Sequence, residues 1–277
     1  MHTQTPDHAW FLNLPNPMIV GHRGAAGHAP ENTIISFTRA LELGADALEL
    51  DVQPTADGDA VVIHDRTVDR TTESVGAVES MTMTQLKKLD AGYRFTPDQG
   101  QTFPFRDQGH RFTTLTETLE AFPGIRFVVE IKRDTPALCK AVLRAIRNAR
   151  AQDRVLVGSF KDEALRYLRE CEPSLATGAG TKETKQFVIA SHLHASGWVA
   201  KPYFALQVPP RYGRWPVITE ITMNHARKHG LHVQVWTIDE PDEMRRLVAL
   251  GVHGITTNYP DRARFLTKHR SCGNLPA

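Results

Sequence analysis

Charged side chains lie two residues apart at two places in the chain, each within a run of apolar residues. Glu49 and Asp51 belong to the first run, and Glu130 and Lys132 belong to the second. Because successive side chains of a strand point to opposite faces, each pair should share one face of its strand. Carboxylates gathered in this way are hard oxygen ligands, which suit Mg²⁺ or Ca²⁺. We therefore predict that Glu49, Asp51 and Glu130 bind one divalent cation.

Two histidines and an arginine lie at the ends of other short apolar runs. His22 and Arg23 follow the run 18–21, and His64 ends the run 60–64. Histidine titrates near neutral pH, so His22 and His64 are candidates for acid–base catalysis. Arg23 and Lys132 can hold an anion, and Arg can contact phosphate oxygens through two nitrogens. With a divalent cation, these groups suit a phosphodiester: one histidine would deprotonate the nucleophile and the other would protonate the leaving alkoxide. The residues do not decide which histidine is the base.

These side chains can meet only if the strands that carry them share one sheet. Short apolar runs alternate with stretches of helical periodicity, which predicts βαβ units and a parallel sheet. Strands are expected at 18–21, 47–53, 60–64, 126–131, 155–159, 176–180, 203–208, 233–238 and 254–257. Helices are expected at 33–43, 136–149, 162–170, 217–228 and 241–250, with a short one at 84–89.

The connection between the second and third expected strands is too short for a parallel crossover. It contains Asp57-Gly58, a strong hairpin signal, so the strand at 60–64 should fold back antiparallel. The remaining strands predict an α/β fold, a (β/α)8 TIM barrel that forms a single domain over residues 1–277. Residues 66–113 break the alternation, and we interpret them as a small insertion after strand 2 that lies over the barrel mouth. In such barrels the active site lies at the C-terminal ends of the strands, where the chemical residues above should gather.

Composition limits the class of protein. The 277 residues carry 33 Lys and Arg against 31 Asp and Glu, a formal net charge of +2. That balance, without a dense basic run, argues against a nucleic-acid partner. No run approaches the roughly 18 apolar residues of a transmembrane helix, and residues 1–15 do not resemble a signal peptide. We expect a cytoplasmic protein and leave its oligomeric state open. Trp10 and its apolar neighbours are expected to cover the barrel bottom.

Short motifs occur in a fixed order along most of the chain. They are Gly21-His22-Arg23-Gly24, Pro30-Glu31-Asn32-Thr33, Glu49-Leu50-Asp51-Val52, His64-Asp65, Asp69-Arg70-Thr71-Thr72, Glu130-Ile131-Lys132, Ser159-Phe160 and Val235-Trp236-Thr237. In order and spacing this set resembles the glycerophosphodiester phosphodiesterase family. The resemblance implies a TIM barrel with an insertion after strand 2 and a divalent cation bound by the three carboxylates. It also implies catalysis by His22 and His64, with Arg23 and Lys132 on the phosphate.

The resemblance further implies substrate-binding positions at Glu31 and Trp236. Glu31 could equally be an acidic residue in the first turn of a helix, and Trp236 could serve only in barrel packing. The segment 208–216 should lie at the barrel mouth, where we predict that Trp215 forms part of an apolar wall for the substrate. Its aromatic residues could instead pack the loops together. Near the last strand, Asn258 replaces an Asp that is frequent in the family, which leaves the substrate preference open.

The predicted reaction is the metal-dependent hydrolysis of a glycerophosphodiester to an alcohol and glycerol 3-phosphate. The aromatic residues of the insertion and of the segment 208–216 raise a second hypothesis. It is a lysophospholipase D that releases choline or ethanolamine from lysophospholipids. Barrels similar to phospholipase C or sphingomyelinase D also combine two histidines with a metal, so the product could be a cyclic phosphate. A binding protein without turnover is disfavoured, since no catalytic histidine or metal carboxylate of the family motif is missing.

Overall fold

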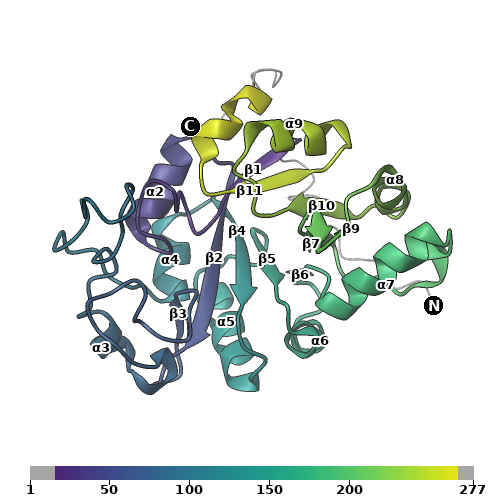
Figure 1. Ribbon diagram of the computed structural model, residues 1–277. Helices are drawn as coiled ribbons and strands as arrows, with labels where there is room; N and C mark the ends of the chain where they lie inside the picture. Colours follow the sequence, from purple (N-terminus) through teal and green to yellow (C-terminus); the bar gives the residue numbers. More distant parts are fainter. Residues whose placement is uncertain (1–15, 268–277) are drawn as a thin grey trace.

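Parallel strands form a barrel at the centre of the computed structural model, which describes residues 16–267 (Figure 1). Around the barrel the strands are β6 (Ala176–Thr177), β5 (Val155–Gly158), β4 (Arg126–Ile131), β2 (Ala47–Pro54), β1 (Met18–Gly21), β11 (Gly254–Thr257), β10 (His232–Val235) and β7 (Ala205–Val208). A parallel bridge between Gly178 and Ala205 closes the ring between β6 and β7. The predicted (β/α)8 TIM barrel is confirmed. Trp10 and its neighbours lie outside the described residues.

The predicted hairpin is also present. β3 (Ala60–Val62) pairs antiparallel with β2, with Val52 opposite Val62. It ends two residues earlier than expected, so His64 lies just beyond the strand. The side-chain amide of Gln53 donates to the carbonyl oxygen of His64 at 2.9 Å, which holds the chain beside β2 at this point.

Helices surround the barrel (Figure 1). They are α2 (Ile34–Glu42), α3 (Met83–Leu86), α4 (Leu115–Ala121), α5 (Pro136–Asn148), α6 (Asp162–Cys171), α7 (Thr181–His192), α8 (Glu220–Lys228) and α9 (Pro241–Ala249), with 3₁₀ turns η1 (Val78–Ser80), η2 (Ser196–Trp198) and η3 (Pro260–Thr267). The helix expected at 217–228 begins later, because the Thr219 side chain accepts from the Thr222 backbone N–H as an N-cap. Among residues 16–267, no helix combines the length and the apolar character that crossing a membrane requires.

Alternation along the strands decides which side chains enter the barrel. On β2, Leu48 and Leu50 pack in the cluster between the strands and the outer helices. Ala47 belongs instead to the inner cluster, which fills the barrel together with Met18, Val128, Leu156 and others. Because side chains alternate with period two, Glu49 and Asp51 must point inward like Ala47. They lie further along the strand, nearer its C-terminal end.

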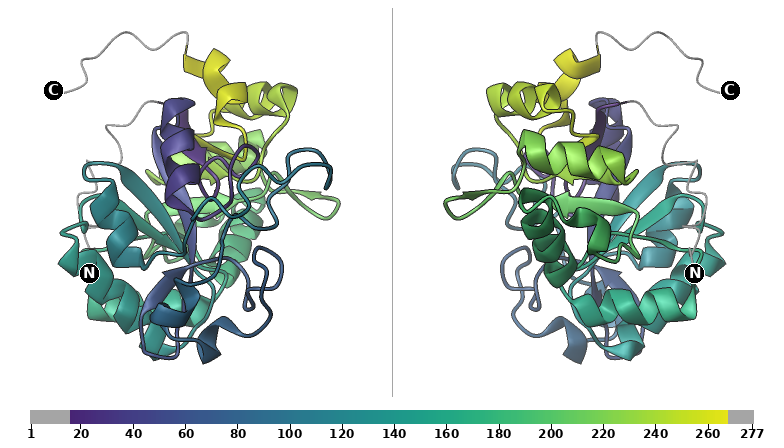
Figure 2. Two further views of the ribbon diagram at one scale, coloured as in Figure 1. Left: turned by 90° about the vertical axis from the view of Figure 1, so that its left-hand side faces the viewer. Right: turned by 90° about the vertical axis from the view of Figure 1, so that its right-hand side faces the viewer.

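Residues 66–113 form a long connection with little regular structure. Its apolar residues pack into a small cluster of their own with the ends of β3, consisting of Val61, Ile63, Val68, Val78, Met83, Leu86, Ala91 and Phe112. An ion pair of 3.0 Å joins Glu79 of this segment to Arg133 after β4. The segment 208–216, expected as a loop, contains a short hairpin. Its strands are β8 (Arg211–Tyr212) and β9 (Trp215–Pro216). Figure 2 shows this hairpin projecting from the same side of the barrel as the loops of residues 66–113.

Candidate active site

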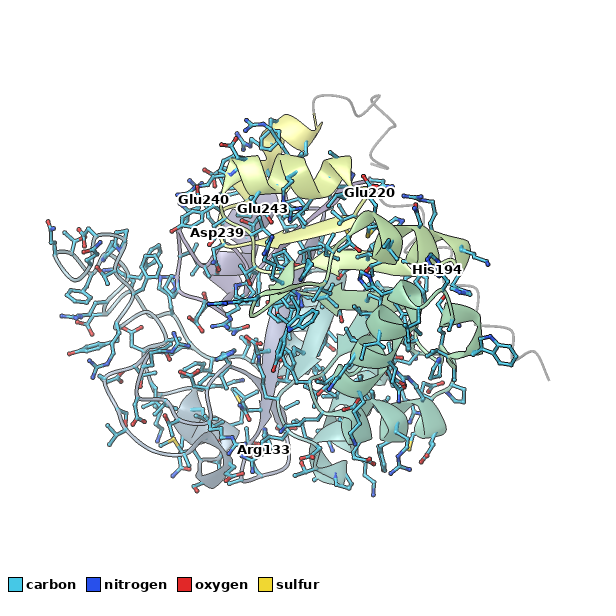
Figure 3. All side chains as sticks on the ribbon, turned by 45° about the vertical axis from the view of Figure 1, so that its right-hand side comes forward. Arg133, His194, Glu220, Asp239, Glu240 and Glu243 are labelled. Carbon is cyan, nitrogen blue, oxygen red and sulfur yellow. The ribbon has the colours of Figure 1, made fainter. Side chains whose placement is uncertain are left out.

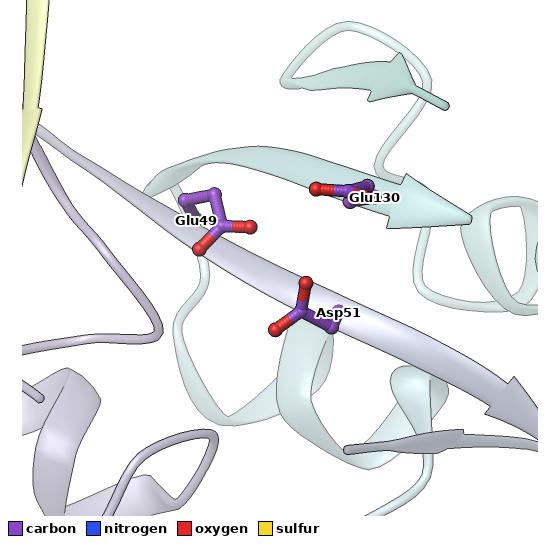
Figure 4. Close-up of side chains that lie close together, drawn as sticks. All are labelled: Glu49, Asp51 and Glu130. Carbon is purple, nitrogen blue, oxygen red and sulfur yellow. The ribbon is translucent and has the colours of Figure 1, made fainter. Parts of the chain in front are cut away.

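Three carboxylates converge inside the barrel near its C-terminal end. Glu49 and Asp51 come from β2, and Glu130 comes from β4, where it is the register partner of Asp51. Each offers an oxygen atom within 4.8 Å of the others (Figure 4). Glu49 and Asp51 are almost fully buried. A set of three carboxylate oxygens at this spacing suits a hard divalent cation such as Mg²⁺ or Ca²⁺.

Two basic side chains border the carboxylates. The Lys132 ammonium lies 2.8 Å from Asp51 Oδ1 and 2.8 Å from Glu130 Oε1. On the other side, Arg23 Nε lies 3.1 Å from Asp51 Oδ2. The backbone N–H of Arg23 donates to Glu49 Oε2 at 2.8 Å. Lys132 and Arg23 therefore bring positive charge to the edge of the carboxylate group, where an anionic phosphodiester could also contact it.

Burial and mutual repulsion set the protonation of the carboxylates. Burial raises the pKa of Glu49 well above its ordinary value, and the charges of Asp51 and Glu130 raise it further. Burial also raises the pKa of Glu130. Burial opposes ionisation of Asp51 too, but the ammonium of Lys132 and the guanidinium of Arg23 outweigh it and hold the pKa of Asp51 below its ordinary value. Glu49 thus lacks sufficient positive charge nearby, and a divalent cation among the three carboxylates would supply it.

The turn after β1 has an unusual backbone. Arg23 has a φ of 50° and Gly24 a φ of 88°, both in the left-handed region. A Cβ atom on Gly24 would lie 2.4 Å from Ser36 Oγ, so only glycine fits. Ser36 Oγ and the Asn32 backbone N–H both donate to the carbonyl oxygen of Arg23. These contacts hold a strained residue in place, which is typical of functional sites.

His22 is oriented by a pair of residues from the other end of the chain. Its Nδ1 lies 2.7 Å from Asn258 Oδ1, and Asn258 Nδ2 donates to Asp239 at 2.8 Å. Figure 3 labels Asp239 in the segment between β10 and α9. Because the Asp239 carboxylate can only accept, the amide oxygen of Asn258 must face His22 and the proton must be on Nδ1. His22 Nε2 is then an acceptor, 3.9 Å from Glu49 Oε2. Burial and the nearby Arg23 lower the pKa of His22, which favours the neutral ring.

His64 has a different partner. Its Nδ1 lies 2.6 Å from Asp65 Oδ1. The other oxygen of Asp65 accepts from Arg70 Nε at 2.5 Å. Arg70 also makes two hydrogen bonds of 2.7 Å to Glu31, and Glu31 accepts from Arg23 at 2.9 Å. A continuous network therefore links His64 to Arg23 through a residue of the segment 66–113.

The structure contradicts one of the two interpretations of Glu31. The first-turn interpretation is wrong, because α2 begins at Ile34 with Thr33 as its N-cap and has no acidic residue in its first turn. Burial raises the pKa of Glu31, but the hydrogen bonds from Arg70 and the charge of Arg23 lower it below its ordinary value. Glu31 is thus an ionised carboxylate that holds two guanidinium groups.

The two tryptophans differ in their surroundings. Trp236 directly follows β10 and packs edge-to-face against Phe160, which follows β5, with ring centroids 5.5 Å apart. Trp215 lies on β9 as the register partner of Tyr212, and both side chains are 79% exposed. Trp236 therefore belongs to the ring of strand ends, whereas Trp215 projects from a hairpin.

The structure brings together Glu49, Asp51, Glu130, Lys132 and Arg23, with His22 beside Glu49. His64 lies near enough to Asp51 and Glu130 to interact electrostatically with both carboxylates. The sequence patterns did not reveal the positions of Asp239 and Arg70. Asp239 orients His22 through Asn258, and Arg70 contacts Asp65, the partner of His64. Asn258 was noted only as a departure from a motif. The available signals were Asp239, which directly follows the strand expected at 233–238, and Arg70, which belongs to the motif Asp69-Arg70-Thr71-Thr72.

Comparison with known proteins identifies the family. Residues 22–262 match the model of the glycerophosphoryl diester phosphodiesterase family. The chain belongs to this family. It is 36% identical over 253 residues to a glycerophosphodiester phosphodiesterase of Caldanaerobacter subterraneus subsp. tengcongensis, covering 88% of this chain and 95% of that protein. It is 33% identical over 261 residues to a glycerophosphodiester phosphodiesterase of Bacillus subtilis, covering 90% of this chain and 87% of that protein.

Solved structures agree with the barrel of this phosphodiesterase family. The glycerophosphoryl diester phosphodiesterase domain of a Mycobacterium tuberculosis protein superposes with a TM-score of 0.82 at 22% identity, covering 91% of this chain and 99% of that one. The family match and the curated relatives together make the chain an enzyme, a phosphoric diester hydrolase of the glycerophosphodiester phosphodiesterase type.

Proposed function

We propose that this phosphodiesterase hydrolyses glycerophosphodiesters to an alcohol and glycerol 3-phosphate, with Mg²⁺ or Ca²⁺ bound by Glu49, Asp51 and Glu130. The observation that carries the proposal is the convergence of these three carboxylates within 4.8 Å beside His22. The activity named for its relatives, at 36% and 33% identity, supports the substrate class. The raised pKa of Glu49 supports a cation at this position, because a bound cation would offset the repulsion among the carboxylates.

Each histidine has the partner that its proposed role requires. His22, oriented by Asn258 and kept neutral by its burial and by Arg23, accepts a proton from the nucleophile at Nε2. His64, hydrogen-bonded to Asp65, donates a proton to the leaving alcohol. When bound, the cation would polarise the phosphodiester and offset negative charge on its oxygens. Arg23 and Lys132 bind the phosphoryl oxygens from the two sides of Asp51.

The remaining predicted residues act around this centre. Glu31 positions Arg23 and contributes to substrate binding through it. Trp236, packed against Phe160, provides an apolar surface for the alcohol or the glycerol carbons. The segment 66–113 covers one edge of the barrel mouth, and its Arg70 joins Glu31 to Asp65. Trp215 would contact only a substrate that extends beyond the strand ends, because its side chain projects from the β8–β9 hairpin.

A lysophospholipid is the less favoured substrate. An acyl chain lying against Trp215 and Tyr212 would stay open to water, because both side chains are 79% exposed. Little apolar surface would be removed from water, so the acyl chain would contribute little binding free energy. A glycerophosphodiester with a small alcohol needs no such wall.

Choline release from glycerophosphocholine tests the proposal. The assay is run with Mg²⁺, with Ca²⁺ and with EDTA, and with the variants Glu49→Ala and His22→Ala. We expect release that requires a divalent cation and is lost in both variants. Glu220→Gln, at the start of α8, serves as a control and should behave as wild type. Turnover that survives EDTA and both substitutions would contradict the proposal, and phosphorus NMR of the product distinguishes a linear from a cyclic phosphate.

A further inference from the structure

An apolar surface lies on the outside of the barrel, on α7 and η2. Trp198 is 93% exposed, Leu193 is 71% exposed and Ile189 is 50% exposed. These residues line a shallow hollow of about 480 Å³ together with Gln186, Ala190, Ala195, Val199 and Ala200. The hollow is formed by the C-terminal part of α7 and the connection that leads from α7 to the start of β7. It is therefore near the end of the barrel opposite the three carboxylates. Large exposed apolar side chains gathered in one place are typical of an interaction surface.

The loop that presents Trp198 is held in place by specific contacts. The buried Ser196 hydroxyl lies 2.5 Å from His225 Nδ1 and 2.9 Å from His229 Nε2, both at the C-terminal end of α8. The Lys201 ammonium donates to the carbonyl oxygens of Ser196 and Val199 at 2.8 Å and 2.5 Å. Figure 1 shows α7 and α8 side by side on the outside of the barrel. The exposure of Trp198 is thus imposed by a well-bonded turn.

The surroundings of this surface are basic. Lys185 lies one helical turn before Ile189, and Lys201 directly follows Ala200. The one acidic residue between positions 181 and 202, Glu183, is paired with Arg169 at 2.6 Å.

The neighbouring helices add basic charge and little acidic charge at this place. The half of α8 beside the surface carries Arg227 and Lys228, and the adjacent His225 ring contacts that of His194. Glu220 is at the opposite end of α8, and Figure 3 labels it apart from His194. On α6, Arg166 pairs with both Glu163 and Glu170, which leaves one negative charge there, and Asp162 lies beside Lys182 at the start of α7. The apolar surface therefore faces solvent with an excess of positive charge.

We propose that this surface docks on an anionic lipid bilayer. Trp198, Leu193 and Ile189 would enter the interfacial region, where tryptophan is favoured and apolar side chains leave water. Lys185 and Lys228 would contact the headgroup phosphates, since lysines near an anionic membrane surface are attracted to it. The docking surface lies away from the catalytic carboxylates, so the proposal does not depend on the identity of the substrate.

A second copy of the chain fits this surface less well. In a twofold dimer the same patch meets itself, which would bring Lys185 and its basic neighbours against their own copies. A stable protein–protein interface also needs roughly 20–30 residues from each partner. The hollow is lined by eight residues, fewer than such an interface needs. Charge complementarity therefore favours an anionic surface over self-association.

Vesicle co-sedimentation of the full-length protein tests the proposal. The probes are vesicles of phosphatidylcholine alone and of phosphatidylcholine with phosphatidylglycerol in equal amounts. We expect binding to the anionic vesicles only, weakened by added salt. Lys185→Gln should weaken it about 5-fold, from roughly 1 kcal/mol per lysine near the surface. Trp198→Ser should weaken it at least about 10-fold, from the loss of a large apolar contact. Trp215→Ser, which removes an exposed tryptophan elsewhere, is the matched control and should bind as wild type.

Three outcomes would overturn the proposal. The first is equal binding to neutral and anionic vesicles, or binding that Trp198→Ser leaves unchanged. The second is a wild-type dimer in sedimentation velocity that Trp198→Ser converts to monomer, which would make the surface a subunit interface. The third is loss of vesicle binding in Trp10→Ser but not in Trp198→Ser, which would assign binding to the N-terminal segment. Unchanged melting temperature and unchanged glycerophosphocholine turnover in Trp198→Ser would establish that the variant is folded.

Discussion

Asn258 presents its amide oxygen to His22 at 2.7 Å, while its amide nitrogen donates to Asp239 at 2.8 Å. The Asp239 carboxylate therefore does not contact the imidazole directly, because the Asn258 amide lies between them. The Asn258 amide fixes the tautomer and by itself raises the pKa of the ring, but burial and the charge of Arg23 outweigh it and hold that pKa below its ordinary value. His64 has the opposite arrangement, because the Asp65 carboxylate contacts its ring directly. This difference in partners supports the opposite proton transfers that we propose for the two histidines.

The pH dependence of turnover should report this difference. A base must be unprotonated in the free enzyme, so its pKa sets the acidic limb of kcat/KM. Since the pKa of His22 is lowered, we expect activity to persist as the pH falls below about 6.5, the ordinary value for histidine. In the double variant Asp239→Asn with Asn258→Asp, a carboxylate contacts His22 and should raise its pKa. The acidic limb should then move to higher pH.

The single variant Asp239→Asn is the control for this pair. It leaves the Asn258 amide without a fixed orientation, and loss of such an outer partner typically costs roughly 10-fold to 100-fold in activity. The double variant should recover part of this loss, because the amide introduced at position 239 can donate to the carboxylate introduced at position 258. A double variant whose acidic limb coincides with that of wild type would rule out the proposed role of Asn258.

Thermal stability should report the cation site independently of turnover. The pKa of Glu49 is raised in the folded protein, so without a cation the free energy of unfolding decreases as the pH rises above the ordinary value of 4.5. A divalent cation favours the carboxylate and should restore this stability. At 100 times the dissociation constant the gain is about 2.7 kcal/mol, which is roughly 5–10 °C for a chain of this size.

Glu49→Gln separates the cation effect from other contacts. The amide oxygen can still accept from the Arg23 backbone N–H, and the neutral side chain removes repulsion from Asp51 and Glu130. We expect a melting temperature in EDTA at least as high as that of wild type, and no increase on adding Mg²⁺ or Ca²⁺. Glu220→Gln should retain the full increase. If Glu49→Gln is stabilised by the cation as much as wild type, the cation binds elsewhere.

The barrel and the carboxylate site could be predicted because they follow from local rules. Period-two alternation places Glu49 and Asp51 on one face of β2, and the Asp57-Gly58 hairpin excludes β3 from the barrel count. β4 then becomes the neighbour of β2, which brings Glu130 beside Asp51. No long-range information is needed for these steps.

Other features depend on contacts that no local pattern contains. Asp239 and Asn258 lie far from His22 in sequence, and polar residues after strands are common. The helix α7 was missed because Ile189 and Leu193 are apolar but face solvent, which blurs the amphipathic pattern. For α4, the Thr114–Glu117 capping box was present in the sequence but was not used.

Arg70 should matter for activity more than for stability. It joins Asp65 to Glu31 and is half exposed, so its ion pairs should contribute about 1 kcal/mol or less to folding. Without Arg70, Glu31 would hold Arg23 alone and Asp65 would lose a partner that keeps its pKa low. We expect Arg70→Gln to lower kcat/KM about tenfold, equivalent to roughly 1.4 kcal/mol of transition-state stabilisation. Arg66→Gln, an exposed arginine in the same segment, is the control. Equal losses in both variants would mean that the effect is one of net charge.

Substrate preference can be assigned by comparing two tryptophan variants on two substrates. Trp236 lies at the strand ends against Phe160, so Trp236→Ala should lower kcat/KM about tenfold for glycerophosphocholine and for lysophosphatidylcholine alike. Trp215 is 79% exposed on the β8–β9 hairpin, and we propose that only a long substrate contacts it. Trp215→Ala should therefore weaken lysophosphatidylcholine turnover more than glycerophosphocholine turnover. We expect wild type to favour glycerophosphocholine. Faster turnover of lysophosphatidylcholine by wild type, with a selective loss in Trp215→Ala, would instead make the enzyme a lysophospholipase D. Equal losses on both substrates in Trp215→Ala would exclude the hairpin as an acyl-chain wall.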